Sequence, residues 1–159
     1  MELYLLRHGI AEDGLPGTPD SARLLTPEGR ERVAAVLKMA RHGGTNPSLI
    51  LSSPYVRAHQ TAEIAAREFE YKGEIPKLQS LVPHGRPEAV WADIRDYADE
   101  SAILLAGHEP LMSELAAYLL NAPSLRVDMK KSALIRIDFA VVGAVPYGTL
   151  RWMLVPKLA

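Results

Sequence analysis

The chain has 159 residues, of which 48% are hydrophobic and 23% are charged, and its formal net charge at pH 7 is −1. This length predicts a single domain over residues 1–159 with one hydrophobic core, and the near-neutral charge indicates neither a nucleic-acid partner nor a membrane surface. The chain contains no cysteine, which excludes a disulfide framework, a thiolate nucleophile and cysteine-ligated zinc.

The first residues do not form the pattern of a signal peptide. Glu2 is acidic, and only four apolar residues, Leu3 to Leu6, precede Arg7. A signal peptide needs a basic start and a longer apolar run. No later stretch reaches the roughly 18 apolar residues of a membrane-spanning helix, so we expect a cytoplasmic protein.

Strands and helices are predicted to alternate along the chain. The apolar run Leu3–Leu6 lacks polar alternation, which is typical of a strand buried on both faces of a parallel sheet. After a polar loop over residues 12–25, Thr26-Pro27 predicts the N-cap and first turn of a helix that ends near Gly43. Ser53-Pro54 repeats this capping pattern. The other expected elements are strands at 48–52, 101–106, 133–140 and 149–155, a short strand or extended segment at 76–81, and helices at 56–69, 88–97 and 111–120.

This alternation predicts an α/β fold, a three-layer sandwich with a mostly parallel central sheet. The last two strands flank a turn rich in glycine and proline, so they are expected to pair as an antiparallel hairpin at the C-terminal end. Ligands of open α/β sheets bind outside the carboxyl ends of the strands. The chemistry of this protein is therefore sought in the residues that directly follow predicted strands.

Three motifs in those places combine to predict an anion site. They are Arg7-His8-Gly9, Ser52-Ser53-Pro54 with Arg57 one helical turn later, and Gly107-His108-Glu109. Taken singly, Arg57 could be a solvated helix arginine and His108 a satisfied core residue. A parallel sheet, however, brings two histidines and two arginines to one edge, and a phosphoryl dianion is the natural ligand for such a cluster.

The motifs resemble those of the histidine phosphatase superfamily, which has the phosphoglycerate mutase-like fold. The resemblance rests on Arg7-His8-Gly9, on Ser52-Ser53-Pro54 with Arg57-Ala58 and Gln60-Thr61-Ala62, and on Gly107-His108, which occur in the family's order. The segments 23–29 and 130–134 resemble its short branch, the SixA-type phosphohistidine phosphatases. The resemblance spans essentially the whole chain.

The resemblance also implies a mechanism and a role for each residue. His8 would be the nucleophile and carry a covalent phosphohistidine intermediate, while Arg7 and Arg57 clamp the phosphoryl oxygens. His108, expected to be protonated when phosphate is bound, would donate to the transferring group, and Gly9 would allow a tight turn beside the phosphate or serve as an ordinary turn glycine. The implied activity is hydrolysis of phosphohistidine on a protein in signal transduction, with inorganic phosphate as product and no metal or other cofactor. The implied partner is a phosphorylated protein such as a histidine-containing phosphotransfer domain, and neither nucleic acid nor membrane is implied.

The sequence departs from the family's commoner pattern because it lacks an acid where phosphate esterases usually carry one. No carboxylate occurs in residues 78–85, and a positioned general acid contributes about 10²–10⁴-fold to the rate. Imidazole leaves phosphorus more readily than an alkoxide does, so the absence favours a P–N bond as substrate. Glu12 and Glu109 stay open as acids, the alternative being a surface or helix N-terminal acid. Arg23 is either a phosphate or partner contact or a solvated loop arginine.

Two other functions are compatible with the same motifs. A small-molecule phosphomonoesterase or mutase of the superfamily would use the same residues, although the loops are short for a lid over a metabolite. A noncatalytic phospho-binding module is less favoured because His8 is present. Metal-dependent hydrolysis is disfavoured because the histidines do not occur at ligand spacing.

Overall fold

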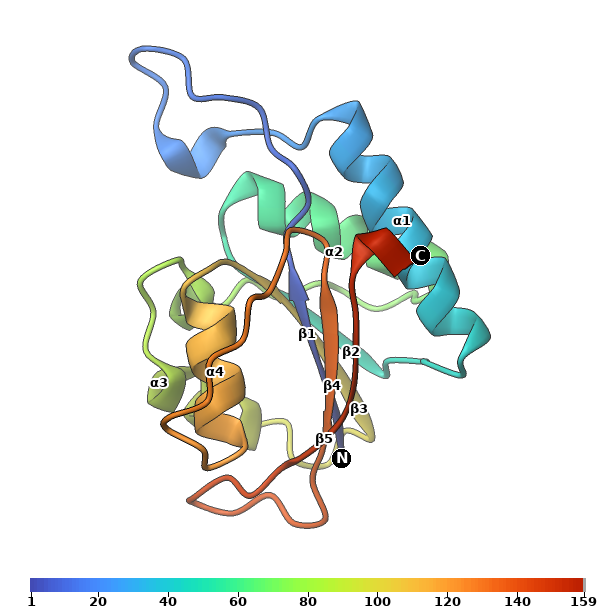
Figure 1. The fold of residues 1–159 in the computed structure, drawn as a ribbon, viewed down its shortest axis with the longest axis vertical. Coiled ribbons are helices and arrows are strands. Elements are labelled where there is room, and N and C mark those ends of the chain that lie inside the picture. The colour runs from blue at the N-terminus through green and yellow to red at the C-terminus, as the bar shows by residue number, and fades with distance from the viewer. Residues whose placement is uncertain (159) are drawn as a thin grey trace.

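The central element of the sheet is β1 (Glu2–Arg7), which lies third in the strand order β2-β3-β1-β4-β5. In the computed structural model, which describes residues 1–158, β2 (Leu49–Ser52) and β3 (Ala102–Gly107) run parallel to β1 (Figure 1). β4 (Leu134–Asp138) pairs antiparallel with β1, and β5 (Thr149–Leu154) pairs antiparallel with β4. These pairings confirm the predicted α/β sheet with an antiparallel C-terminal hairpin.

Helices cover both faces of the sheet, as the three-layer prediction required. α1 (Pro27–His42) and α2 (Val56–Glu68) cover one face, and α3 (Pro87–Arg95) and α4 (Leu111–Leu119) cover the other (Figure 1).

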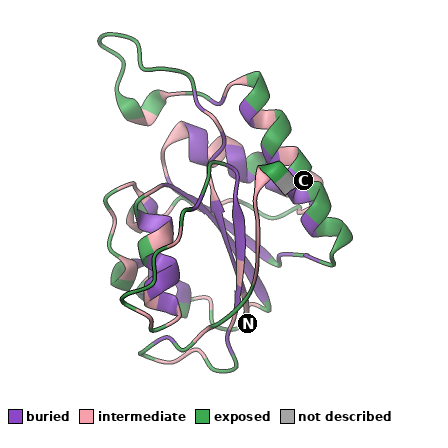
Figure 2. Cartoon of the chain, viewed as in Figure 1, coloured by how far each residue is buried: buried purple, intermediate pink, exposed green. Residues whose placement is uncertain are grey.

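The side chains of β1 alternate between the two layers, because successive residues of a strand point to opposite faces. Leu3 and Leu5 pack with residues of α3 and α4, whereas Tyr4 and Leu6 pack with residues of α1 and α2. All four are fully buried, and Figure 2 shows the burial continuing along the neighbouring strands. The strand is apolar without alternation because it has a core on each side.

One local prediction is wrong, and a tertiary contact explains it. Ser53 does not cap α2: the helix begins at Val56 with Tyr55 as its N-cap, and the Ser53 hydroxyl lies 2.8 Å from His108 Nε2 instead. The segment 76–81, expected as a short strand or extended segment, forms a single bridge between Lys77 and Ser52 and then a 3₁₀ turn, Gln79–Leu81.

The remaining elements agree with expectation within a few residues at their ends, and Thr26 caps α1 by accepting a hydrogen bond from the Gly29 amide at 2.9 Å. Further 3₁₀ turns span Asp20–Ala22 and Pro156–Leu158. None of the helices formed by residues 1–158 is long and apolar enough to cross a membrane. The prediction of a single domain over residues 1–159 stays a prediction.

The segment that leaves β1 rests directly on the first turn of α1. A Cβ atom on Gly29 would lie 2.2 Å from the carbonyl oxygen of Ile10, and one on Gly9 would lie 2.8 Å from the carbonyl oxygen of Gly29. The Thr26 amide also donates to the Ile10 carbonyl at 2.9 Å. These backbone contacts fix the position of the residues that follow β1.

We expect Gly29→Ala to destabilise the protein by about 1–3 kcal/mol, because its methyl group must displace backbone rather than a flexible side chain. The control is Gly143→Ala, whose Cβ would meet nothing closer than the Val145 carbonyl oxygen at 3.8 Å. This control should change the free energy of unfolding by no more than about 1 kcal/mol. Urea unfolding of both variants measures the difference, and equal midpoints would contradict the close contact.

Candidate active site

Four of the residues singled out in the sequence lie together at the carboxyl edge of the sheet. Arg7 ends β1, His8 follows it, His108 follows β3, and Arg57 lies in the first turn of α2. The ring centroids of His8 and His108 are 5.0 Å apart, and Arg57 Nε donates to His8 Nε2 at 3.2 Å. His8, Arg57 and His108 are 7%, 5% and 1% exposed, so their charges interact with little screening.

The hydrogen bonds of His8 fix its tautomer. Nδ1 lies 2.6 Å from the carbonyl oxygen of Gly9, which can only accept a hydrogen bond, so Nδ1 carries the proton. Nε2 receives the Arg57 N–H and therefore holds the lone pair. Burial, together with the charges of Arg57, Arg7 and Lys131, lowers the pKa of His8 to about 3. His8 is consequently a neutral imidazole with a nucleophilic nitrogen at Nε2.

His108 is held by two residues of the segment that leads into α2. Its Nε2 lies 2.8 Å from Ser53 Oγ, and the Tyr55 ring packs edge-on against it with centroids 5.1 Å apart. Burial and the charges of His8 and Arg57 lower the pKa of His108 to about 2. Its Nδ1 atom and Nε of Arg7 are buried without a hydrogen-bond partner among residues 1–158, so each has an unused hydrogen-bonding capacity.

Asp20 completes the site, although no local pattern in the sequence predicts it. Arg57 donates through Nη2 to the Asp20 carboxylate at 2.9 Å and through Nη1 to the Asp20 carbonyl at 2.7 Å. The other Asp20 oxygen accepts from Arg23 Nη1 at 3.0 Å, and Arg23 Nε donates to the Glu12 carbonyl. Hydrogen bonds from Arg23 and Arg57 lower the pKa of Asp20. Arg23 is thus linked to the site through Asp20 rather than contacting the histidines.

The two carboxylates considered as acids make their hydrogen bonds elsewhere or are exposed. Glu109 accepts hydrogen bonds from the amide and hydroxyl of Ser113, which places it at the N-terminal turn of α4. The Glu12 side chain is exposed, and its backbone carbonyl binds Arg23. Within residues 1–158, neither carboxylate is hydrogen-bonded to His8 or His108.

Gly9 is attached to α2 through Thr61. The Gly9 amide donates to Thr61 Oγ1 at 3.2 Å, and the same hydroxyl donates to the Arg57 carbonyl at 2.8 Å. One buried hydroxyl therefore holds the turn after β1 against the helix that carries Arg57.

No group of three or more histidine, aspartate or glutamate side chains in residues 1–158 is placed to hold a metal ion.

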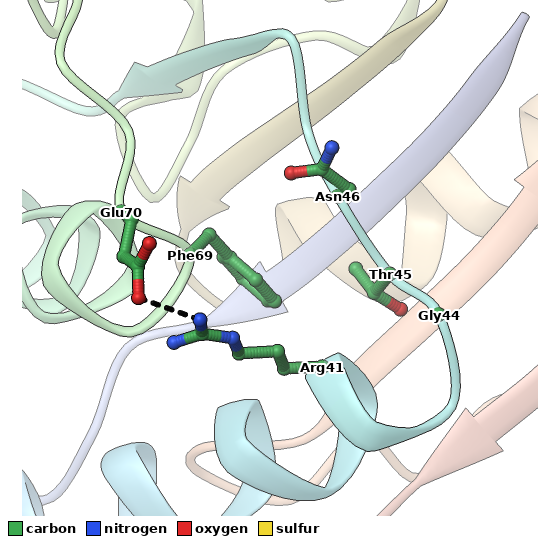
Figure 3. A pocket seen from close by; sticks show the side chains of 6 residues that line it. All are labelled: Arg41, Gly44, Thr45, Asn46, Phe69 and Glu70. Atoms are coloured by element: carbon green, nitrogen blue, oxygen red, sulfur yellow. Dashed lines mark hydrogen bonds and ion pairs between the residues drawn. The ribbon is translucent and has the colours of Figure 1, made fainter.

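A separate hollow of about 280 Å³ lies at the opposite edge of the sheet (Figure 3). It is formed by the last turn of α1, the residues between α1 and β2, and the residues that follow α2, so it lies away from the strand ends that carry His8 and His108. Arg41 in this hollow is paired with Glu70 at 2.6 Å and donates to the Glu68 carbonyl. Its cation is therefore already satisfied.

Comparison with known proteins agrees with this arrangement. Residues 3–81 match the sequence model of the histidine phosphatase superfamily (branch 1). An uncharacterised protein of Picosynechococcus sp. is 36% identical over 140 residues, which is 85% of this chain and 83% of that protein. The phosphohistidine phosphatase SixA of Escherichia coli is 28% identical over 121 residues, 75% of this chain and 74% of its own. The solved structure of SixA with tungstate superposes with a TM-score of 0.86 over 99% of this chain and 98% of that one, at 24% identity.

The lowered pKa of His8 predicts a pH-dependent loss of stability. A histidine in the unfolded chain takes up a proton near pH 6.5, whereas folded His8 stays neutral down to about pH 3. Below pH 6.5 the unfolded state therefore binds the extra proton, and stability falls by at most about 1.4 kcal/mol per pH unit. In urea unfolding, the wild type should lose roughly 1 kcal/mol more than His8→Gln between pH 6 and pH 5. Parallel pH profiles would contradict the buried neutral imidazole.

Proposed function

The chain belongs to the histidine phosphatase superfamily, and we propose that this phosphatase removes phosphoryl groups from phosphohistidine on a protein. The observation that carries the proposal is the lone pair of His8 Nε2, which lies beside Arg57 and His108 in a site rich in donors. In the proposal His8 is the nucleophile, and Arg7, Arg57 and His108 bind the phosphoryl oxygens. Gly9 keeps the backbone close to them.

The reaction proceeds through two in-line displacements. His8 Nε2 attacks phosphorus, the new Nε2–P bond forms as the P–N bond of the substrate breaks, and the leaving imidazole takes a proton from solvent. The Gly9 carbonyl retains the proton on Nδ1, so the phosphorylated ring stays oriented. Water then attacks phosphorus and loses a proton to solvent as the Nε2–P bond breaks. Inorganic phosphate leaves, and neutral His8 is regenerated.

The binding of a dianion changes the electrostatics of the site in a defined direction. Phosphoryl oxygens compete with Asp20 for Arg57, and the Asp20 side chain, which is 56% exposed, has space to move aside. The dianion also offsets the arginine charges and thereby raises the pKa of His108 towards protonation. His108 then donates to the transferring group as a charge-assisted donor.

The choice of a P–N substrate is supported by the state of the carboxylates. An acid that protonates a leaving alkoxide must itself be protonated and within reach. Asp20 is bonded to two arginines and its pKa is lowered, so it is ionised at neutral pH. Glu109 is engaged by Ser113 and Glu12 is exposed. An alcohol would therefore leave without help, whereas imidazole departs readily.

Three finer points stay predictions. They are expectations from the sequence: that the partner is a histidine-containing phosphotransfer domain, that the protein acts in signal transduction, and that it is cytoplasmic. The alternative is a phosphomonoesterase or mutase that acts on a small molecule with the same catalytic residues. Substrate preference separates it from the proposal.

The substrate experiment compares a phosphohistidine protein, an aryl phosphate and a sugar phosphate. We expect kcat/KM to be highest for the phosphohistidine protein, since no carboxylate of residues 1–158 is hydrogen-bonded to His8 or His108 where it could protonate a leaving alkoxide. His8→Ala should lower this value by at least about 10³-fold and abolish the acid-labile phosphoenzyme formed in rapid-quench measurements. Equal or better turnover of the sugar phosphate would overturn the P–N assignment.

The three hydrogen bonds of the Arg57 guanidinium lead to a second prediction. Each of its three nitrogens donates a hydrogen bond, one to His8 and two to Asp20. A lysine would offer a single ammonium group in their place. Arg57→Lys should lower kcat by about 10²–10³-fold. The matched control is Arg67→Lys on the exposed surface of the same helix, which should retain wild-type kcat. A fully active Arg57→Lys would remove Arg57 from the proposed site.

A further inference from the structure

A cleft of about 1020 Å³ opens beside the candidate active site, with Arg7 as their shared residue. This volume is at the upper end of ligand pockets and far exceeds what a phosphoryl group fills. Its border carries one carboxylate, Asp128, and half-buried apolar residues, Ile10, Val155 and Pro156. Five cationic side chains line it: Arg7, Arg32, Lys130, Lys131 and Lys157. We refer to the cleft bordered by these cationic, acidic and apolar residues as the lysine cleft.

The segment that carries Lys130 and Lys131 is anchored to the end of β1. Arg7 Nη1 donates to the Met129 carbonyl at 2.6 Å, and the Ser132 amide donates to the carbonyls of Arg7 and His8 at 3.1 and 3.2 Å. Ser132 is fully buried and has a positive φ of 67°, a conformation that its backbone contacts must maintain. The two lysines are therefore presented at a fixed place beside His8.

The charge of the lysine cleft is available to a ligand. Lys130 pairs with Asp128 and Arg32 pairs with Glu28, both at 2.6 Å, but these pairs are exposed and such pairs contribute little free energy. Lys131 has no ion pair with a carboxylate of residues 1–158. Its charge reaches the nucleophile, since it contributes to the lowered pKa of His8.

We propose that the lysine cleft binds an acidic segment that flanks the phosphohistidine of the protein substrate. This inference rests on the proposed function. Because Arg7 borders both sites, a polypeptide with its phosphoryl group at His8 Nε2 continues into the cleft. The cleft has five cations and one carboxylate, whereas the whole chain has a net charge of −1, so positive charge is concentrated here. This local charge is complementary to the carboxylates of an acidic segment and increases the rate at which the two meet. The apolar residues pack against the stems of the bound side chains.

The test uses two phosphohistidine peptides of equal length, one flanked by glutamate and the other by glutamine. At low salt, wild-type kcat/KM should be about tenfold higher for the glutamate peptide, mainly through KM. Raising the salt to about 0.3 M should reduce this preference, because it screens exposed charges. The double variant Lys131→Glu/Lys157→Glu should reverse the preference, and Lys131→Gln/Lys157→Gln should weaken it without introducing new charge.

Lys72→Glu is the matched control. Lys72 is exposed, follows α2 and does not border the cleft, so its variant should keep the wild-type preference. The glutamine peptide lacks the flanking charge. A change in its turnover therefore measures any effect of the Lys131 substitution on His8, and any loss of folded protein, separately from the charge preference.

The outcomes separate the two proposals. Equal turnover of both peptides by the wild type, or an unchanged preference in the double variants, overturns the lysine cleft and leaves the proposed function standing. Failure to hydrolyse either peptide, with active turnover of an aryl or sugar phosphate, overturns the proposed function and this inference with it.

Discussion

The organisation of the site depends on the burial of positive charge at one edge of the sheet. A guanidinium that is wholly or partly buried needs hydrogen-bond acceptors. Arg57 is buried and Arg7 is half-buried, and each obtains acceptors from a segment distant in sequence. Arg7 takes the carbonyl of Met129, which draws in the segment before β4, and Arg57 takes the carbonyl and carboxylate of Asp20, which draws in the loop before α1. The need of two cations for partners thus sets the course of two loops around the histidines.

The same charges act on His8 and, in the proposed reaction, on the substrate. Burial, the two arginines and Lys131 lower the pKa of His8, so the ring stays neutral over the whole physiological range and Nε2 accepts the Arg57 N–H rather than a proton. A site that repels a proton from His8 attracts a phosphoryl dianion by the same field. In the proposed reaction the cations stabilise the charge on phosphorus, and the lysine cleft extends that field to the polypeptide that carries it. Catalysis and recognition would then share one electrostatic origin.

The strand-end rule was sufficient to place Arg7, His8 and His108 near one another, because their positions follow from parallel topology alone. Arg57 followed from its place in the first turn of the next helix. Asp20 could not be predicted, since an exposed loop carboxylate carries no periodicity and its role depends on contacts 37 residues away. Ser53 could not be placed correctly either, because a hydroxyl before proline is a helix-cap pattern and only the folded chain brings His108 within reach of Ser53.

A glycine contact joins the turn after β1 to α1. Gly9 and Gly29 leave no room for side chains between two backbones, and the Thr26 amide donates to the Ile10 carbonyl in the same place. The backbone that carries His8 therefore rests directly on α1. The loop that bears Asp20 is held to the site largely by side-chain hydrogen bonds. Because Arg57 bonds both Asp20 and His8 Nε2, a substrate that displaces this loop also changes the hydrogen bonding at His8.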